Sequence, residues 1–186
     1  MGKVTEPIAK RIRKKAAKDI KGGFFGMITH YIPGWHGYQA KEERRAADKV
    51  LREFLADQLR LVKQDLEKLQ AMMVDYNLTK TYETFDRMLA LTDKIESAMR
   101  YADYGYSAWG SKEKIGGKSL DRMYQFDAVI IEDIGAINDV VEEFADKMNQ
   151  GKFDDAWDYT YRTWQIMQRL EEKWAQREGF MKGYQE

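Results

Sequence analysis

The chain has 186 residues, of which 44% are hydrophobic and 33% charged, a balance that predicts one folded domain and excludes a disordered chain. It contains no cysteine, so disulfides, thiolate metal ligands and cysteine nucleophiles are excluded together. The net charge of zero hides an asymmetry: residues 1–45 hold eleven Lys or Arg against four Asp or Glu, and the remainder holds twenty against twenty-seven. A basic N-terminal arm favours an anionic partner.

The first predicted element is a basic amphipathic helix in the segment IAKRIRKKAAKDI, with Gly22 and Gly23 as its C-terminus. Ile8, Ile12 and Ile20 form a narrow apolar stripe. The basic side chains beside it are Lys10, Arg11, Arg13, Lys14, Lys15, Lys18 and Lys21. Such a helix suits an anionic lipid surface and equally a nucleic-acid backbone. The alternative is an arm whose isoleucines dock on the rest of the protein without binding a ligand.

Residues 22–39, GGFFGMITHYIPGWHGYQ, combine glycines with aromatic rings, and Pro33-Gly34 fits the centre of a type II turn. The large side chains here form either a buried lid on the bundle or an exposed wedge for a membrane or protein partner; they include Phe24, Phe25, Tyr31 and Trp35. The only histidines are His30 and His36. Since no Asp or Glu lies between Lys21 and Lys41, we expect no metal site and no cofactor.

Residues 40–186 show four helical periodicities and no strand pattern, which predicts an all-α, antiparallel up-down bundle of four long helices. Residues 1–39 are the basic helix and aromatic loop appended to it. The first long helix spans about residues 40–76, with its seam at Leu51, Leu55, Leu59, Val62, Leu66, Leu69, Met73 and Tyr76. The second spans about residues 80–103, with its seam at Phe85, Met88 or Leu89, Thr92, Ile95, Met99 and Ala102.

A second aromatic loop, YGYSAWGSKEKIGGKS, contributes Tyr104, Tyr106 and Trp109, and Ser119 is the predicted N-cap of the third helix. That helix spans residues 120 to about 148, with its seam at Leu120, Met123, Asp127, Ile130, Ile134, Ile137, Val141, Phe144 and Met148. The fourth spans about residues 154–177. Its predicted core side chains are Trp157, Thr160 or Tyr161, Trp164, Met167 and Trp174. Because the aromatic residues recur at helical spacing on one face, they fit a core better than a platform on which a cofactor or nucleic-acid base stacks.

Asp127 is the anomaly in the regular seam of the third helix, because a carboxylate at a core position is costly unless it is paired. We expect it to reach water near the helix start, or to pair with an arginine such as Arg100 or Arg122. Its predicted role is structural rather than chemical. No long helix contains a histidine, and no phosphate-binding glycine motif or nucleophile-with-base pattern occurs, so the sequence favours a non-enzymatic protein.

Two segments resemble an uncharacterised family of prokaryotic helical proteins. YIPGWHGYQAKEERRAADKVLRE carries an Ile-Pro-Gly-aromatic-x-Gly-Tyr run, and RYADYGYSAW followed by LDRMYQFD carries a Tyr-Gly-Tyr loop before an aromatic-x-Phe-Asp. The resemblance covers about a third of the chain and implies no activity, substrate or catalytic residue. It implies that the two aromatic loops and Asp127 belong to a recurring design.

The up-down order predicts that both aromatic loops and the basic arm gather at one pole of the bundle, and loops on a rigid scaffold commonly bind partners. We therefore expect a scaffold or adaptor that uses this pole to engage an anionic membrane surface or a protein partner. Nucleic-acid or ribosome binding by the same arm is the alternative, and an enzyme or ligand carrier with a pocket at the loop end is a third. Self-association is also compatible with long amphipathic helices. With no signal-peptide core and no apolar run long enough to span a bilayer, we expect a cytoplasmic protein that is at most membrane-peripheral.

Overall fold

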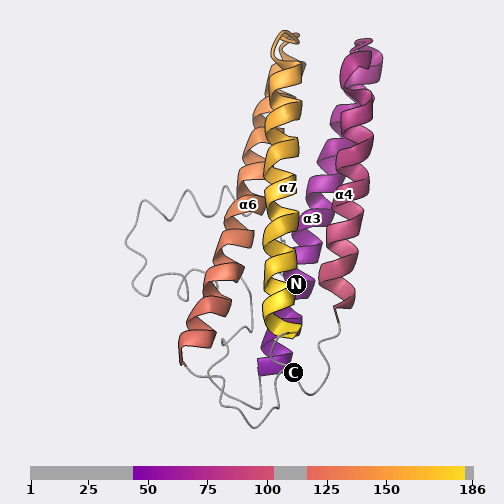
Figure 1. The fold of residues 1–186 in the computed structure, drawn as a ribbon. Helices are drawn as coiled ribbons and strands as arrows, with labels where there is room; N and C mark the ends of the chain where they lie inside the picture. The colour runs from indigo at the N-terminus through magenta and orange to yellow at the C-terminus, as the bar shows by residue number, and fades with distance from the viewer. Residues whose placement is uncertain (1–43, 103–116, 183–186) are drawn as a thin grey trace, which may run out of the picture.

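The computed structural model describes residues 44–102 and 117–182, and it arranges them as four long helices in two hairpins (Figure 1). The helices are α3 (Arg44–Asp75), α4 (Tyr82–Tyr101), α6 (Gly117–Asn149) and α7 (Ala156–Lys182), and a short 3₁₀ turn, η1 (Thr79–Thr81), precedes α4. At about 1.5 Å per residue, α3 and α6 are each roughly 50 Å long. The all-α four-helix bundle predicted from the periodicity is confirmed. The predicted N-terminal basic helix lies outside the described residues.

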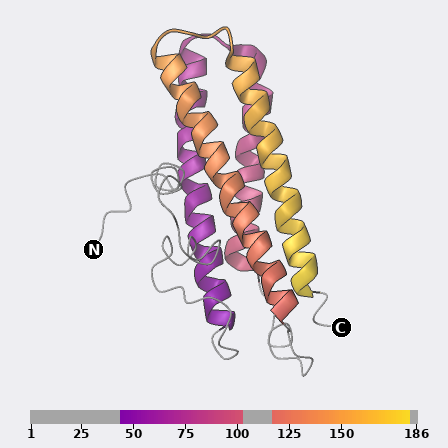
Figure 2. The same cartoon turned by 90° about the vertical axis from the view of Figure 1, so that its left-hand side faces the viewer.

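The two hairpins pack side by side so that each helix contacts one antiparallel and one parallel neighbour. Helix α3 packs against α4 and α6, and α7 packs against α6 and α4. Figure 2 looks onto α6, with α3 and α7 on either side of it. Successive helices run in opposite directions, as predicted. Consequently α3 and α6 are parallel to each other, and so are α4 and α7. The end of α4 and the start of α6 consequently occupy diagonal corners of the bundle.

The two ends of the bundle differ in how the helices are joined. At the end that we call the apical pole, tight turns connect α3 to α4 and α6 to α7 (Figure 1). At the opposite end, the basal pole, α3 and α6 begin and α4 and α7 end. The up-down order on which the predicted gathering of the loops and the basic arm depends is thus observed, while the loops and the arm themselves lie outside the described residues.

Both apical turns use a residue in the left-handed conformation to end a long helix. Asn77, after α3, has φ 58°, and Gly151, after α6, has φ 70°. In each turn, the next residue donates its N–H to a carbonyl five positions back, which is the Schellman pattern. The bonds are Leu78 N to Met73 O at 2.9 Å and Lys152 N to Lys147 O at 3.0 Å. The DYNLT and NQGKFD segments thus stop their helices through backbone geometry.

The core follows the predicted seams closely. In α3, every predicted position from Leu51 to Met73 is buried, and in α6 the same holds from Met123 to Met148. In α4, Met88 takes the core position rather than Leu89, which is half-buried. Helix α6 begins at Gly117, two residues before the predicted N-cap, so Ser119 lies within its first turn rather than capping it.

Two aromatic residues predicted to be in the core, Tyr76 and Trp157, are exposed instead, and of the alternatives Thr160 and Tyr161 it is Thr160 that is buried. Tyr76 is 48% exposed, Trp157 is 52% exposed and Tyr161 is 48% exposed. In α7 the buried stripe runs through Ala156 and Thr160, each one position before the aromatic residue. A shift of one residue rotates a side chain by about 100° around a helix, enough to turn it from core to solvent. Trp157 and Tyr161 stack on each other, with ring centroids 6.3 Å apart.

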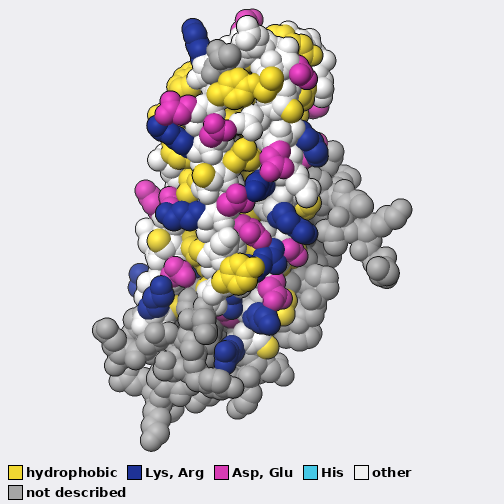
Figure 3. Space-filling view, turned by 90° about the vertical axis from the view of Figure 1, so that its right-hand side faces the viewer, with side chains coloured by type: hydrophobic (Ala, Val, Ile, Leu, Met, Phe, Trp, Pro, Cys, Tyr) yellow, Lys and Arg dark blue, Asp and Glu magenta, His cyan; other side chains and the backbone are white. Residues whose placement is uncertain are grey.

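The surface over α4 and its neighbours mixes both signs of charge with scattered apolar side chains (Figure 3). Single exposed apolar residues are normal on a folded protein, so this face does not by itself mark an interface. No helix within 44–102 or 117–182 is long and apolar enough to cross a bilayer.

Candidate functional site

A buried chain of charged side chains connects all four helices near the basal pole. Its centre is Arg177 of α7, the largest side chain in the described structure that is fully buried. Arg177 Nε donates to Asp127 Oδ1 of α6 at 2.7 Å, and its Nη2 donates to Asp48 Oδ1 of α3 at 2.6 Å. One guanidinium therefore bridges carboxylates from two other helices, one of them diagonally across the core.

The chain continues from Asp48 to α4. Arg52 Nε donates to Asp48 Oδ2 at 2.8 Å, one helical turn along α3. Arg52 Nη1 then donates to the backbone carbonyl of Met99 at 2.8 Å. We call the four side chains of Asp48, Arg52, Asp127 and Arg177 the basal network. Since it contains two carboxylates and two guanidinium groups, its formal charge is zero.

The basal network satisfies the condition under which ions can be buried. Asp127 and Arg177 are completely inaccessible to solvent, and Asp48 is 1% exposed. Such groups lose several kcal/mol of hydration each, which only close, well-aligned opposite charges can offset. The guanidinium of Arg177 also lies over the ring of Trp174, 5.2 Å from the centroid, a favourable cation–π position. The network acts as a clamp that joins four helices near their basal ends.

Asp127 pairs with an arginine, as one of the two expectations held, but the two arginines named as examples are wrong. It is fully buried, so it does not reach water, and it pairs with Arg177 rather than with Arg100 or Arg122. Arg100 instead forms ion pairs with Asp57 at 3.0 Å and with Glu96 at 2.7 Å. Its hydrogen bond to Asp57 is the larger cause, and that to Glu96 the second, of a raised pKa of Arg100. Asp127 is buried, as its place in the seam indicates, and its structural role stays a prediction.

Sequence reasoning missed three of the four members of the basal network. Asp48 and Arg52 look like an ordinary surface pair at i, i+4, and Arg177 stands near the end of the last helix. A signal was present, because Arg177 continues the stripe that contains Leu170, Trp174 and Met181. A cation on that stripe was the natural partner for the carboxylate on the seam of α6.

Arg122 occupies a different setting, in a groove between α6 and α7 beside the basal pole. Its guanidinium lies over two rings, 5.7 Å from the centroid of Phe126 and 5.1 Å from that of Phe180. The two rings are themselves 5.7 Å apart. We call this the basal groove; its volume is about 400 Å³, and its lining is Arg122, Gln125, Phe126, Val129, Lys173, Gln176 and Phe180.

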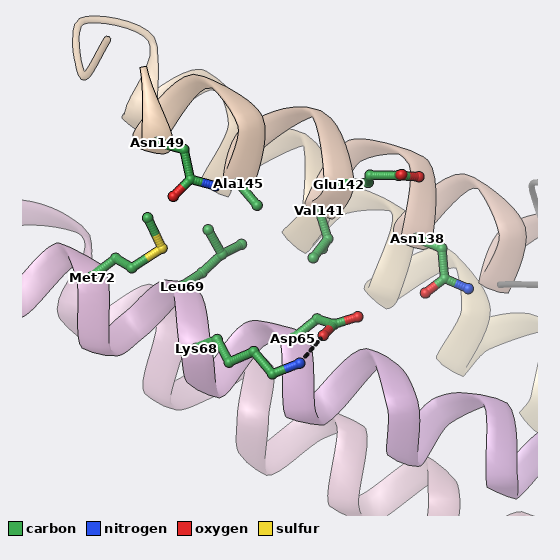
Figure 4. A pocket seen from close by; sticks show the side chains of 9 residues that line it. All are labelled: Asp65, Lys68, Leu69, Met72, Asn138, Val141, Glu142, Ala145 and Asn149. Atoms are coloured by element: carbon green, nitrogen blue, oxygen red, sulfur yellow. Dashed lines mark hydrogen bonds and ion pairs between the residues drawn. The ribbon is translucent and has the colours of Figure 1, made fainter. Parts of the chain in front are cut away.

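A second groove lies in the apical half, between the parallel helices α3 and α6 (Figure 4). Its volume is about 330 Å³. Leu69, Met72 and Val141 form its apolar floor, and Lys68 forms a 2.7 Å ion pair with Asp65 at its edge. Glu142 adds a further carboxylate. This apical groove thus carries an excess of negative charge, unlike the basal groove.

Other polar contacts between helices are distributed along the bundle. Lys63 of α3 bonds to Asp93 of α4 at 2.7 Å, a hydrogen bond that raises the pKa of Lys63. Arg169 of α7 bonds to the buried Asp133 of α6, which raises the pKa of Arg169. Asp133 Oδ2 has no hydrogen-bond partner among the residues described.

The predicted binding residues of the basic arm and of the aromatic loops lie outside the described residues. They are Lys10, Arg11, Arg13, Lys14, Lys15, Lys18, Lys21, Phe24, Phe25, Tyr31, Trp35, Tyr104, Tyr106 and Trp109. The choice between a buried lid and an exposed wedge lies outside them too. Within the two described segments, no three Asp, Glu, His or Cys side chains converge as metal ligands.

Comparison with known proteins gave no match. Neither a protein-family model, nor a curated protein, nor a solved structure is similar to this chain. The resemblance drawn from the two aromatic segments stays a prediction. The candidate site therefore depends on the geometry of the basal pole alone.

Proposed function

We propose that the protein is a non-enzymatic helical scaffold that engages an anionic membrane surface through its basal pole. The carrying observation is that α3 begins, α4 ends, α6 begins and α7 ends at this pole. Residues 1–43, with their basic arm, are joined to the bundle at the start of α3. Residues 103–116, with the second aromatic loop, are joined there at both ends. The proposed setting is the cytoplasmic face of a membrane.

The charge of the apical pole supports this orientation. Residues 139–158, at the apical ends of α6 and α7, contain seven Asp or Glu and two Lys. An anionic surface repels this end and attracts the arm at the other, since the field of the whole molecule orients its approach. The two poles thus favour the same docking direction.

The basal network supports the scaffold part of the proposal. By joining α3, α4, α6 and α7 near their basal ends, it holds the attachment points of the two segments in fixed positions. A rigid platform lowers the entropy cost of bringing several contacts to one surface. The proposed mechanism is electrostatic attraction by Lys10 to Lys21, followed by insertion of Phe24, Phe25 and Trp35.

Co-sedimentation of the full chain with vesicles tests the proposal. We expect binding to vesicles that contain phosphatidylglycerol and little binding to pure phosphatidylcholine. Replacing Lys14, Lys15 and Lys18 by Gln should weaken binding on the order of 100-fold, since each basic residue contributes about 1 kcal/mol at an anionic surface. The matched control replaces Lys80, Lys147 and Lys152 by Gln, which makes the same charge change at the apical pole. It should bind at least as well as the wild type.

The outcomes separate the alternatives. Equal binding of the arm variant and the wild type on both vesicle types would exclude the membrane proposal. Tight, strongly salt-dependent binding to RNA or DNA that requires the arm but is unaffected by Phe24→Ala or Phe25→Ala would assign the arm to nucleic acid instead.

A further inference from the structure

The basal groove holds two cationic side chains beside an apolar floor. Arg122 and Lys173 lie on facing helices, and Phe126, Val129 and Phe180 supply the apolar contacts. None of the seven residues that line it is acidic. Such a combination complements a ligand that joins a negative charge to an apolar body.

The guanidinium carbon of Arg122 lies over two aromatic rings, a position compatible with anion recognition. A guanidinium whose partners are aromatic rings keeps N–H groups available as donors, and two of these can match two oxygens of one phosphate. Among the described residues, the contacts of Arg122 are with the rings of Phe126 and Phe180, and no carboxylate pairs with it. Lys173 has only a long contact, 3.4 Å from Nζ to Gln176 Oε1. Both cations can therefore serve a ligand.

The groove also lies at a suitable height above the basal pole. Arg122 is the sixth residue of α6, and Phe180 is two residues from the end of α7, so both lie within roughly 8 Å of a helix end. Peripheral proteins bury apolar surface roughly 5–10 Å into the headgroup boundary. A basal pole that faces a bilayer would bring these two side chains to the depth of the phosphates.

We propose that the basal groove binds one anionic phospholipid, with Arg122 and Lys173 on the phosphate and Phe126, Val129 and Phe180 against the glycerol and upper acyl chains. The amides of Gln125 and Gln176 lie beside the phosphate as further donors. The choice of a membrane lipid rests on the proposed function, whereas the pairing of anion and apolar body rests on the groove itself. The apical groove does not share this chemistry, because Asp65 pairs with Lys68 and Glu142 lies nearby.

Variants of Arg122 distinguish a lipid site from general surface charge. Arg122→Gln should weaken binding to phosphatidylglycerol vesicles on the order of 10- to 100-fold, the effect of losing a charge-assisted, bidentate contact. Arg122→Lys keeps the charge but loses the fork and the stacking, so it should weaken binding about fivefold. Phe180→Leu should cause a similar loss. Lys68→Gln, the matched control in the apical groove, should stay within about twofold of the wild type.

A soluble lipid separates the groove from the membrane surface. The full chain is titrated with monomeric dihexanoyl-phosphatidylglycerol, and the Nε–H resonances of the arginines are followed by NMR. We expect the Arg122 signal to shift in the wild type and in Lys68→Gln. Glycerol phosphate and inorganic phosphate should shift it far less, because they lack the apolar part. Dihexanoyl-phosphatidylcholine should also be weak, because its net charge is zero.

Three results would overturn the inference. The first is arm-dependent vesicle binding that Arg122→Gln and Phe180→Leu leave unchanged, which keeps the proposed function and removes the lipid site. The second is an equal Arg122 shift with inorganic phosphate and with the short-chain lipid, which makes the groove a simple anion site. The third is retention of full affinity by Arg122→Lys. If the short-chain lipid shifts the Arg122 signal specifically but the protein does not bind vesicles, the ligand site in the groove is supported and the membrane function is refuted.

Discussion

Removing the guanidinium of Arg177 is the most direct perturbation of the bundle. Arg177→Met replaces the bridge between Asp48 and Asp127 with an apolar side chain of similar length. Asp48 keeps Arg52 as a partner at 2.8 Å, but Asp127 loses the 2.7 Å bond from Arg177 Nε while remaining fully enclosed. The variant therefore contains a buried carboxylate whose charge the opposing helix no longer compensates.

The expected cost is large compared with the stability of a typical domain. Breaking a buried ion pair by deleting one partner costs about 3–5 kcal/mol, within a total of about 5–15 kcal/mol. For a chain of this size, each kcal/mol lowers the melting temperature by about 2–4 °C, so we expect a fall of roughly 6–20 °C. Arg177→Lys should cost less, about 1.5–3 kcal/mol, because an ammonium keeps the charge but cannot bridge both carboxylates in the same geometry.

Urea unfolding followed by circular dichroism at 222 nm measures both variants. The control is Lys94→Met, which removes the 2.6 Å pair between Lys94 and Glu171 on the exposed faces of α4 and α7. Exposed pairs contribute about 0–1 kcal/mol, so this variant should unfold near the wild-type midpoint. If Arg177→Met lost no more stability than Lys94→Met, the argument that the basal network clamps the helices would be refuted.

Three further predictions concern single positions. Gly151→Ala should destabilise the protein by about 1–2 kcal/mol in urea unfolding, because a side chain is strained at φ 70°, and equal stability would contradict the Schellman assignment. Gly179→Ala should stabilise it by about 0.5–1 kcal/mol, since a Cβ at this position in α7 meets no atom within 4 Å; a loss of stability would show an unrecognised contact. Tyr159 donates to Glu143 at 2.7 Å, and this bond raises the pKa of Tyr159 above its ordinary 10.0. The resulting stabilisation is present below the unfolded pKa and is lost as the pH rises through the folded one, so the advantage of the wild type over Tyr159→Phe should shrink above about pH 10.

The sequence predicts the helices well because their signal is local and repeated. In α3 and α6, apolar residues recur every three or four positions over some thirty residues, so the seam is overdetermined. The prediction fails where a shift of one residue changes the face of the helix, as for Trp157 in the first turn of α7, and it leaves Thr160 and Tyr161 undecided. There, small residues (Ala156 and Thr160) take the buried stripe, and the larger Trp157 and Tyr161 are displaced to its flank. Hydrophobicity alone would bury Trp157 and Tyr161. The buried positions further along α7, Met167 and Leu170, fix the face of the helix that puts Ala156 and Thr160 in the core instead.

The site was less predictable because its contacts join residues far apart in the chain. Asp127 was visible as an interruption of an apolar seam, but its partner lies 50 residues later, and Asp48 lies 129 residues before that partner. Arg177 differs from Arg100 and Arg122 in continuing the apolar stripe of its helix, but that stripe does not say which helix α7 faces, so the pairing with Asp127 requires the tertiary fold. The basal groove was missed for the same reason, since its two cations come from different helices.

We expect the basal network to favour one of the two arrangements that the hairpins could adopt. Apolar seams alone would permit α6 to pack beside α3 or beside α4, because both present continuous apolar faces. In the arrangement observed, Arg177 bonds to Asp127 of the neighbouring α6 and to Asp48 of the diagonally opposite α3, and we expect this geometry to favour it over the other packing. Buried polar contacts that exclude alternative packings are a known source of structural specificity.

Replacing the whole network with apolar residues separates specificity from stability. A variant with Asp48→Leu, Arg52→Met, Asp127→Leu and Arg177→Met contains no orphaned charge, so its stability should be close to that of the wild type or higher. Its hairpins, however, should sample both arrangements. Since the chain has no cysteine, spin labels on cysteines introduced at the exposed Ala90 of α4 and Glu142 of α6 report this distance without interference. We expect one narrow distance distribution in the wild type and two distance distributions in the variant, because removing the charges removes the penalty on the second packing. A single, unchanged distribution in the variant would mean that the apolar seams alone select the fold.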